Sequence, residues 1–338
     1  MFTRREMGKL ALAASAGAIV SGPRGLFAAS SQAEPGRPNS LIGGVQIGLI
    51  VPYSLGREAG DAENILRVVT GIGISAIELQ TAPVEAFAGR PASAGGGRGG
   101  GRAGGRGRGQ MSDEERAAQQ AARREAAEAL RAWRTSVSMD RYKALRAMYD
   151  DAGVRIYGFK FDAGLDMEMT DEEYEYVFDV AEALGAGHVT MELSADAALL
   201  RRIGAFAERR KIYAAYHTHS QGSMTAFDEA FAASPANRSN IDVGHYVAGT
   251  GESPLPFFEK FHDRIASFHM KDRRTPANGG DNMPWGQGDT PLGELLRLVQ
   301  RNRWPMPATI ELEYPVPEGS TRAAEIAKCL EFCREALA

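Results

Sequence analysis

Cysteine is nearly absent from this chain, since its 338 residues include only Cys329 and Cys333. The two stand one helical turn apart in a segment with a helical pattern, and such neighbours rarely meet disulfide geometry. The sequence therefore has no disulfide framework. Its stability must come from a buried core, which a chain of this length can form.

Long hydrophobic runs are also missing. The apolar run after "MFTRREMGK" is too short to cross a bilayer comfortably, and no Cys follows it to carry a lipid, so no stable membrane anchor is expected. The Arg4-Arg5 pair and the weakly apolar, Ala-rich run resemble a twin-arginine export signal. The resemblance implies that residues 1–33 are a signal peptide read by the twin-arginine export machinery, and that the mature protein is periplasmic. An N-terminal helix with two solvated arginines is the alternative.

No charge of one sign dominates, because 39 Lys and Arg face 43 Asp and Glu, so the net charge gives no case for nucleic-acid binding. Residues 89–111 are a Gly/Arg-rich run, followed over 112–135 by a highly charged helix pattern. Such runs can bind single-stranded nucleic acid. Export would remove most such partners, so we expect no nucleic acid and interpret 89–111 as a disordered surface insertion. The charged helix would lie near the edge of the predicted sheet where strand 2 ends.

Short β-branched or aliphatic runs alternate with helix patterns from about Val45 onward. Alternation of this kind predicts a parallel sheet, and a count of eight favours a single-domain (β/α)8 TIM barrel over 41–338, with the insertion after strand 2. A doubly wound open sheet is the alternative, but "GLIVPYSLG" is not the Gly-rich phosphate turn expected after its first strand. The expected strands are 45–51, 74–80, 154–161, 188–193, 211–217, 239–245, 265–271 and 307–314.

Acids and histidines recur at the carboxyl ends of five consecutive expected strands. Residues two apart share a face of a strand, and barrel active sites form at this end. Several carboxylates buried together need a cation or a proton to neutralise them. A divalent metal held by three oxygen donors and one imidazole would serve, although each residue alone has an ordinary structural explanation. The proposed ligands are Glu192, Asp242, His269 and Glu311.

The stretches "YHTHSQG", "NIDVGHYVAGTG", "SFHMKDRR" and "TIELEYP" resemble the xylose isomerase-like barrel superfamily of sugar epimerases, inosose-processing enzymes and apurinic endonucleases. The resemblance implies one divalent metal (Mn²⁺, Mg²⁺, Co²⁺ or Zn²⁺) on those four ligands, with Glu192 and Glu311 also moving the proton. Two ligand assignments stay open from the sequence. His219 can replace or supplement Glu192 as a ligand, and Glu313 competes with Glu311, which fits the family pattern better.

Further residues receive substrate-binding roles at the rim. Lys271 is expected to bind a substrate hydroxyl or to stabilise an oxyanion, as a catalytic residue. Trp285 can cover a sugar face or anchor its loop, and His217 can be structural instead. The expected substrate-binding residues are Glu78, His217, His219, His245, Lys271 and Trp285.

A metal beside two carboxylates suits proton abstraction next to a carbonyl. The first hypothesis is a metal-dependent isomerase or epimerase acting on a sugar, keto-sugar or cyclitol. The alternative is a lyase or hydrolase that cleaves 3-keto-glycosides through the same carbanion, and a barrel that binds sugar without turnover is the third. The partner expected is a small carbohydrate, and the sequence allows a homo-oligomer.

Overall fold

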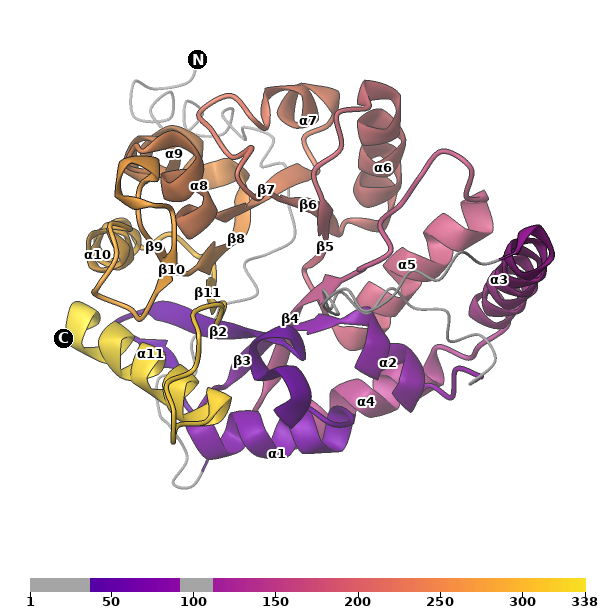
Figure 1. Ribbon diagram of the computed structural model, residues 1–338, viewed down its shortest axis with the longest axis horizontal. Coiled ribbons are helices and arrows are strands. Elements are labelled where there is room, and N and C mark those ends of the chain that lie inside the picture. Colours follow the sequence, from indigo (N-terminus) through magenta and orange to yellow (C-terminus); the bar gives the residue numbers. More distant parts are fainter. Residues whose placement is uncertain (1–36, 92–111) are drawn as a thin grey trace, which may run out of the picture.

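The computed structural model describes residues 37–91 and 112–338, and eight parallel strands within them form a closed barrel. The pairing of β2 with β3 closes the ring, which confirms the TIM barrel and rules out the open sheet (Figure 1). The barrel strands are β2 (Val45–Val51), β3 (Ala76–Gln80), β4 (Arg155–Lys160), β5 (His188–Glu192), β6 (Tyr213–His217), β7 (Asn237–Asp242), β8 (Ile265–Met270) and β11 (Ala308–Ile310).

Helices surround the strands on the outside of the barrel (Figure 1). Their ends follow capping chemistry: the Thr170 side chain accepts from the Glu173 N–H at the start of α5, and Gly185 ends that helix in the left-handed conformation. Among the described residues, no helix is both long enough and apolar enough to cross a membrane. The helices are α1 (Ala62–Ile72), α2 (Thr81–Phe87), α3 (Asp113–Arg134), α4 (Asp140–Asp151), α5 (Asp171–Leu184), α6 (Ala197–Arg210), α7 (Asp228–Ala233), α8 (Val243–Thr250), α9 (Leu255–Phe261), α10 (Leu292–Asn302) and α11 (Arg322–Leu337), with short 3-10 helices η2 (Tyr53–Glu58), η4 (His262–Arg264) and η5 (Pro276–Asn278).

Several short elements are not predicted by the sequence patterns. They are α2, α8, and the strands β1 (Leu41–Ile42), β9 (Asp272–Arg273) and β10 (Asn282–Met283). The expected strand 239–245 is too long, because β7 ends at Asp242 and α8 begins at the next residue. With no loop between strand and helix, the hydrophobic pattern carries no sign of the change.

The interior of the barrel is partly polar directly below the candidate site. Tyr157, His188 and Glu78 point inward and are buried. Room for them comes from glycine: a Cβ at Gly158 would lie 2.7 Å from His188 Nε2, and one at Gly48 would lie 2.6 Å from the Tyr157 ring. Buried polar groups of this kind require partners, and they form a hydrogen-bonded network described below.

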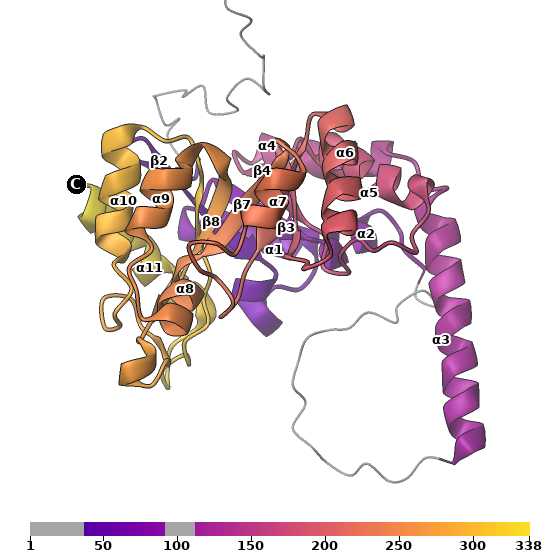
Figure 2. The same cartoon turned by 90° about the horizontal axis from the view of Figure 1, so that it is seen from above.

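The charged segment expected over 112–135 forms α3, which begins with a capping box between Ser112 and Glu115. The helix projects away from the barrel (Figure 2). Its last turn is held by two ion pairs, Arg131 with Glu173 and Arg134 with Glu85. Of the predicted insertion, 89–91 are described and Arg90 also pairs with Glu85, whereas 92–111 lie outside the described residues.

The two ion pairs of α3 should differ strongly in their contribution to stability. Glu85 is fully buried, so Arg134→Ala should lower the free energy of unfolding by about 3 kcal/mol, at the lower end for a broken buried pair because Arg90 remains. Arg131 is 55% exposed, and Arg131→Ala should cost at most about 1 kcal/mol. Chemical denaturation of both variants checks this, and equal losses would contradict it.

Candidate functional site

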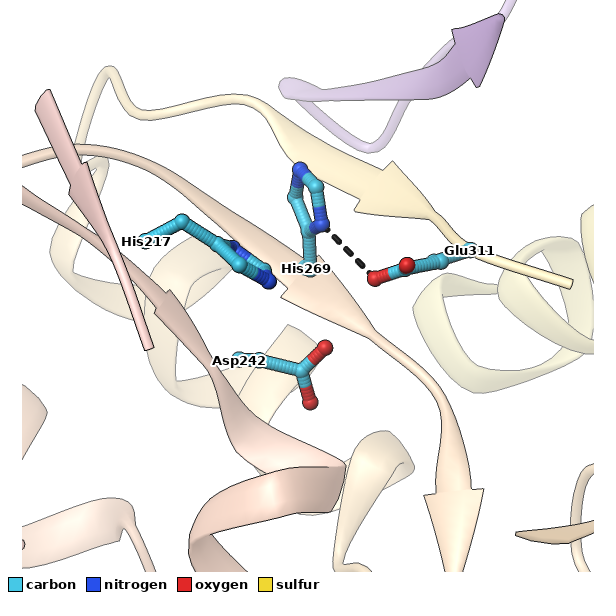
Figure 3. A group of neighbouring side chains, drawn as sticks. All are labelled: His217, Asp242, His269 and Glu311. Carbon is cyan, nitrogen blue, oxygen red and sulfur yellow. Dashed lines mark hydrogen bonds and ion pairs between the residues drawn. The ribbon is translucent and has the colours of Figure 1, made fainter. Parts of the chain in front are cut away.

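Four buried side chains converge at the carboxyl ends of neighbouring strands. His217, Asp242 and His269 stand at the ends of β6, β7 and β8, and Glu311 follows β11 directly. One ligand atom from each lies within 4.8 Å of all the others, so a single ion could contact the whole set (Figure 3). We call these four residues the central cluster.

His269 lies between two carboxylates. Its Nδ1 is 2.8 Å from Glu311 Oε2, and its Nε2 is 3.0 Å from Glu78 Oε2. Burial opposes the charged ring, but the two carboxylates outweigh it and raise the pKa of His269 to about 9. The pairing with Glu78 is the arrangement that metal-binding histidines use, in which one ring nitrogen binds the ion and the other donates to a carboxylate. Glu78 itself lies inside the barrel and not at the open rim where the sequence places it.

His217 is held as a neutral ring with one nitrogen available. The Asn240 amide donates to Glu78 and to Ser267 at 3.3 and 2.6 Å, so its oxygen is left to accept from His217 Nδ1 at 2.9 Å. Burial lowers the pKa of His217 well below its usual range. With the proton on Nδ1, the lone pair of Nε2 is the group this ring can offer to an ion.

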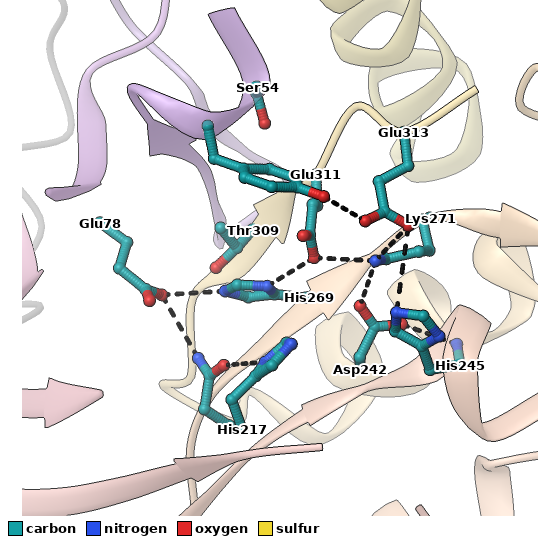
Figure 4. Close-up of polar contacts among 12 residues, drawn as sticks. Ser54, Glu78, His217, Asp242, His245, His269, Lys271, Thr309, Glu311 and Glu313 are labelled. Atoms are coloured by element: carbon teal, nitrogen blue, oxygen red, sulfur yellow. Dashed lines mark hydrogen bonds and ion pairs between the residues drawn. The ribbon is translucent and has the colours of Figure 1, made fainter. Parts of the chain in front are cut away.

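Lys271 occupies the centre of a group of carboxylates. Its Nζ lies 3.0 Å from Asp242, 3.2 Å from Glu311 and 2.8 Å from Glu313, and Figure 4 shows it among them. Burial would lower the pKa of Lys271, but these three carboxylates outweigh it and raise that pKa. Burial also raises the pKa of Asp242, and Lys271 only partly offsets this. The raised pKa of Lys271 and the raised pKa of Asp242 have one cause, because a single ammonium lies among three carboxylates and cannot compensate all of them.

The charges of the site therefore do not balance. Four carboxyl groups, from Glu78, Asp242, Glu311 and Glu313, face the Lys271 ammonium and the His269 imidazolium, which leaves two negative charges once Asp242, whose pKa is raised to about 7, is ionised. In addition, Asp242 Oδ2 is buried and accepts no hydrogen bond, although Lys271 is within ion-pair distance. A divalent cation would bind a buried carboxylate oxygen that accepts no hydrogen bond and lies beside two imidazoles, so the central cluster fits a metal.

Asp242 and His245 lie at the start of a helix, and no loop separates them. Asp242 is the N-cap of α8, and its Oδ1 accepts from the His245 N–H at 2.7 Å, which leaves Oδ2 to face the cluster. His245 lies in the first turn of α8, its Nδ1 2.6 Å from Arg273 and its Nε2 4.0 Å from Glu313. Burial, together with the nearby Lys271, lowers the pKa of His245 to about 2, so this ring is neutral.

Glu192 lies apart from the central cluster. Its side chain is 51% exposed and contacts Lys160 and His219, each at 3.2 Å. Burial would raise the pKa of Glu192, but these two partners outweigh it, and the carboxylate stays ionised. Glu192, His217 and His219 form a second group with metal-ligand spacing. The structure thus gives the fourth position of the central cluster to His217 and places Glu192, with the unpredicted Lys160, at the rim.

Sequence comparison identifies the family of this barrel. The sequence model of the xylose isomerase-like TIM barrel family matches residues 117–336. The chain belongs to this family. No curated protein matches its sequence. Among solved structures it is similar to a sugar phosphate isomerase/epimerase from Parabacteroides distasonis, with a TM-score of 0.56, 16% identity, and coverage of 91% of this chain and 97% of the other.

Two further structures show the same barrel. One is 3-keto-D-glucoside 4-epimerase from E. coli, with a TM-score of 0.54, 10% identity, and coverage of 86% of this chain and all of the other (100%). The other is a probable 3-DHS dehydratase from Bacillus anthracis, with a TM-score of 0.57, 13% identity, and coverage of 85% and 98%. At these identities the likeness establishes the fold alone.

In this xylose isomerase-like barrel, Trp285 packs on α11. Its ring meets Phe332 edge-on, with centroids 5.6 Å apart, so Trp285 anchors its loop, as the alternative to sugar binding expects. This loop is also held by Asp272, which the sequence patterns do not single out. Asp272 accepts from the backbone N–H groups of Gly286, Gln287, Gly288 and Thr290.

Gly244, between Asp242 and His245, has no room for a side chain because Lys271 packs against it. A Cβ there would lie 2.5 Å from the Lys271 carbonyl oxygen and 2.3 Å from its Cγ, so Lys271 reaches the cluster only past a glycine. Gly244→Ala should destabilise the protein by about 1–3 kcal/mol, because backbone must move. Gly71→Ala in α1, where a Cβ meets nothing within 4 Å, should instead stabilise it by about 0.4–1 kcal/mol. Thermal unfolding compares the two, and a neutral Gly244→Ala would contradict the close approach.

Proposed function

We propose that this barrel is a divalent-metal-dependent isomerase or epimerase that abstracts a proton next to the carbonyl of a sugar, keto-sugar or cyclitol. The observation that carries the proposal is the central cluster, in which Asp242 Oδ2 accepts no hydrogen bond and the carboxyl groups outnumber the cations. Family membership supports the same class of activity.

His217 Nε2, Asp242 Oδ2, His269 Nδ1 and Glu311 would hold the cation, with Glu78 orienting His269. Two nitrogen and two oxygen donors suit Mn²⁺, Co²⁺ or Zn²⁺ better than Mg²⁺, which prefers oxygen ligands. When bound, the cation would polarise the substrate carbonyl and stabilise the negative charge that follows proton loss.

Proton transfer would fall to the chain's own acids and bases. Glu192 is ionised and half exposed at the rim, so its carboxylate can accept a proton from a carbon of a substrate above the cluster. Lys271 is buried among the carboxylates, where its ammonium can donate to a developing oxyanion. Return of the proton from Glu192 to the neighbouring carbon completes isomerisation, and delivery of a proton to the opposite face by a second acid completes epimerisation.

A polar pocket beside the cluster suits a hydroxylated substrate. It has a volume of about 340 Å³ and is lined by Tyr53, Gly56, Asn282, Leu312, Glu313 and Arg322. Asn282 Oδ1 is buried there without a hydrogen-bond donor, so a substrate hydroxyl would satisfy it. Sugar hydroxyls both donate and accept, as this lining requires.

A lyase acting on 3-keto-glycosides is the second candidate. Tyr53 donates a hydrogen bond to Glu313 at the open side of the site, where its hydroxyl could contact the oxygen of a leaving group expelled from the same carbanion. Incubation of metal-loaded protein with ketoses and 3-keto-glycosides in deuterated water tests both. Deuterium in recovered sugar supports the isomerase, and aglycone release supports the lyase. Neither result with any of Mn²⁺, Co²⁺, Zn²⁺ or Mg²⁺ would favour a binding protein.

Export remains part of the proposal. The expected twin-arginine signal, residues 1–33, lies outside the described residues. Outside the cytoplasm sugar phosphates are scarce, so an exported enzyme of this kind would act on free sugars or oxidised glycosides.

A further inference from the structure

A second pocket lies at the opposite end of the barrel from the central cluster. It has a volume of about 350 Å³, within the range of roughly 300–1,000 Å³ that small-molecule sites occupy. Its lining comes from the amino ends of the strands, including Arg155 of β4, Tyr213 of β6, Arg238 of β7 and Ile265 of β8. The central cluster lies at the carboxyl ends of β6, β7, β8 and β11, so the two sites are separate.

The lowest inward-facing layer of the barrel forms this pocket. Arg155, Tyr213 and Arg238 each precede an inward-facing residue by two or four positions, so they share its face. Such layers are usually filled by branched aliphatic side chains. Here Arg155, Tyr213 and Arg238 stand around the opening, and Gly187 and Ala266, which also line the pocket, add little side-chain volume.

One wall of the pocket is flat and aromatic. The Trp304 indole stacks on the His262 ring, with centroids 4.7 Å apart and planes 8° from parallel. Tyr157, Tyr213 and Met306 complete a largely apolar surface. An aromatic ligand would bury its ring against such a wall without losing hydrogen bonds.

One cation of the pocket has no carboxylate partner. The Arg238 guanidinium donates to the backbone oxygen of Asp263, and Arg155 also lines the pocket. The Arg238 guanidinium also lies over the Tyr213 ring, 4.5 Å from its centroid, and within the described part of the chain no carboxylate pairs with it. His188 adds no charge, since burial lowers its pKa to about 4. The charge therefore complements an anion.

We propose that this pocket binds a small aromatic carboxylate, with its ring against Trp304 and its carboxylate on Arg238. A guanidinium binds a carboxylate through two parallel hydrogen bonds, and the apolar walls strengthen that contact by excluding water. The proposal is independent of the reaction at the other end of the barrel.

Variants must spare the network that reaches the central cluster. His188 lines the pocket but bonds to Ser267 at 3.0 Å, and Ser267 bonds to Asn240, the partner of His217. Arg238 contacts Asp263 and Tyr213, and Trp304 contacts His262, all at the pocket end. Arg238 and Trp304 are therefore the residues to change. Arg301, exposed on α10, is the matched control for Arg238.

The test is calorimetric titration of the metal-loaded chain with 2-naphthoate and with its neutral analogue 2-naphthalenemethanol. We expect one naphthoate per chain, binding weakened about tenfold or more by Arg238→Gln and unchanged by Arg301→Gln. Trp304→Ala should weaken both ligands, and the neutral analogue should bind wild type and Arg238→Gln alike. No binding of naphthoate at millimolar concentration, or equal affinities in wild type, Arg238→Gln and Trp304→Ala, would overturn the proposal. Circular dichroism of each variant distinguishes lost binding from lost folding.

Discussion

The Asp242→Ala protein is expected to retain no divalent metal after desalting and to have no detectable turnover. Asp242 Oδ2 is a buried donor atom of the central cluster without a hydrogen bond, and its loss removes one of two oxygen ligands. The effect on metal affinity should exceed the roughly 10–100-fold that partners outside the ligand set contribute. Elemental analysis after loading with Mn²⁺ or Zn²⁺ gives the occupancy.

Two other carboxylates provide the controls. Glu78→Gln should weaken metal binding by about 10–100-fold, because Glu78 orients His269 without joining the cluster. Glu192→Gln should retain metal, since that side chain pairs with Lys160 and His219 at the rim, but should lose proton transfer. Full occupancy in Asp242→Ala, or an empty Glu192→Gln with Asp242→Ala still loaded, would refute the assignment of the central cluster.

Replacement of Lys271 by Met should have opposite effects on the metal-free and the metal-loaded protein. Without metal, the variant leaves Asp242, Glu311 and Glu313 without their common cation and should lose about 3–5 kcal/mol of stability. With metal, the ammonium no longer repels an ion that shares its oxygens. Unit charges roughly 4 Å apart interact by about 4 kcal/mol at an effective dielectric constant of 20, which is enough for a tenfold change in affinity.

Thermal unfolding with and without Mn²⁺ measures both effects at once. The rise in melting temperature on adding metal should be larger in Lys271→Met than in wild type. Lys143→Met is the matched control, because Lys143 pairs with the exposed Asp140 on α4 and not with the central cluster, and its metal-induced rise should equal that of wild type. A smaller rise in Lys271→Met than in wild type would mean that Lys271 helps to hold the ion.

The barrel could be predicted from sequence because its eight strands are short apolar runs separated by capped helices. Strand periodicity also brought Asp242, His269 and Glu311 to one rim, since residues two apart share a face and parallel strands end together. The choice between Glu311 and Glu313 depended on depth, and Glu311 is the one in the cluster, whereas Glu313 pairs with Lys271 and Tyr53 above it.

The fourth member of the cluster could not be predicted in the same way. Glu192 and His217 are register partners at the ends of β5 and β6, so both reach the same level. Their side chains part because Lys160 and His219 engage Glu192, while Asn240 fixes His217 inward. Such contacts join residues far apart in sequence. A signal for α8 did exist, since Asp242 as N-cap and Gly251 as C-cap bound it, but the strand-like run obscured it.

Anomalous diffraction from crystals loaded with Mn²⁺ or Zn²⁺ would locate the metal directly. We expect one anomalous peak within bonding distance of His217 Nε2, Asp242 Oδ2, His269 Nδ1 and Glu311, with the Lys271 ammonium displaced from Asp242. A loaded crystal with no peak at the carboxyl ends of β6 to β11, or with its only peak between Glu192 and His219, would contradict this assignment.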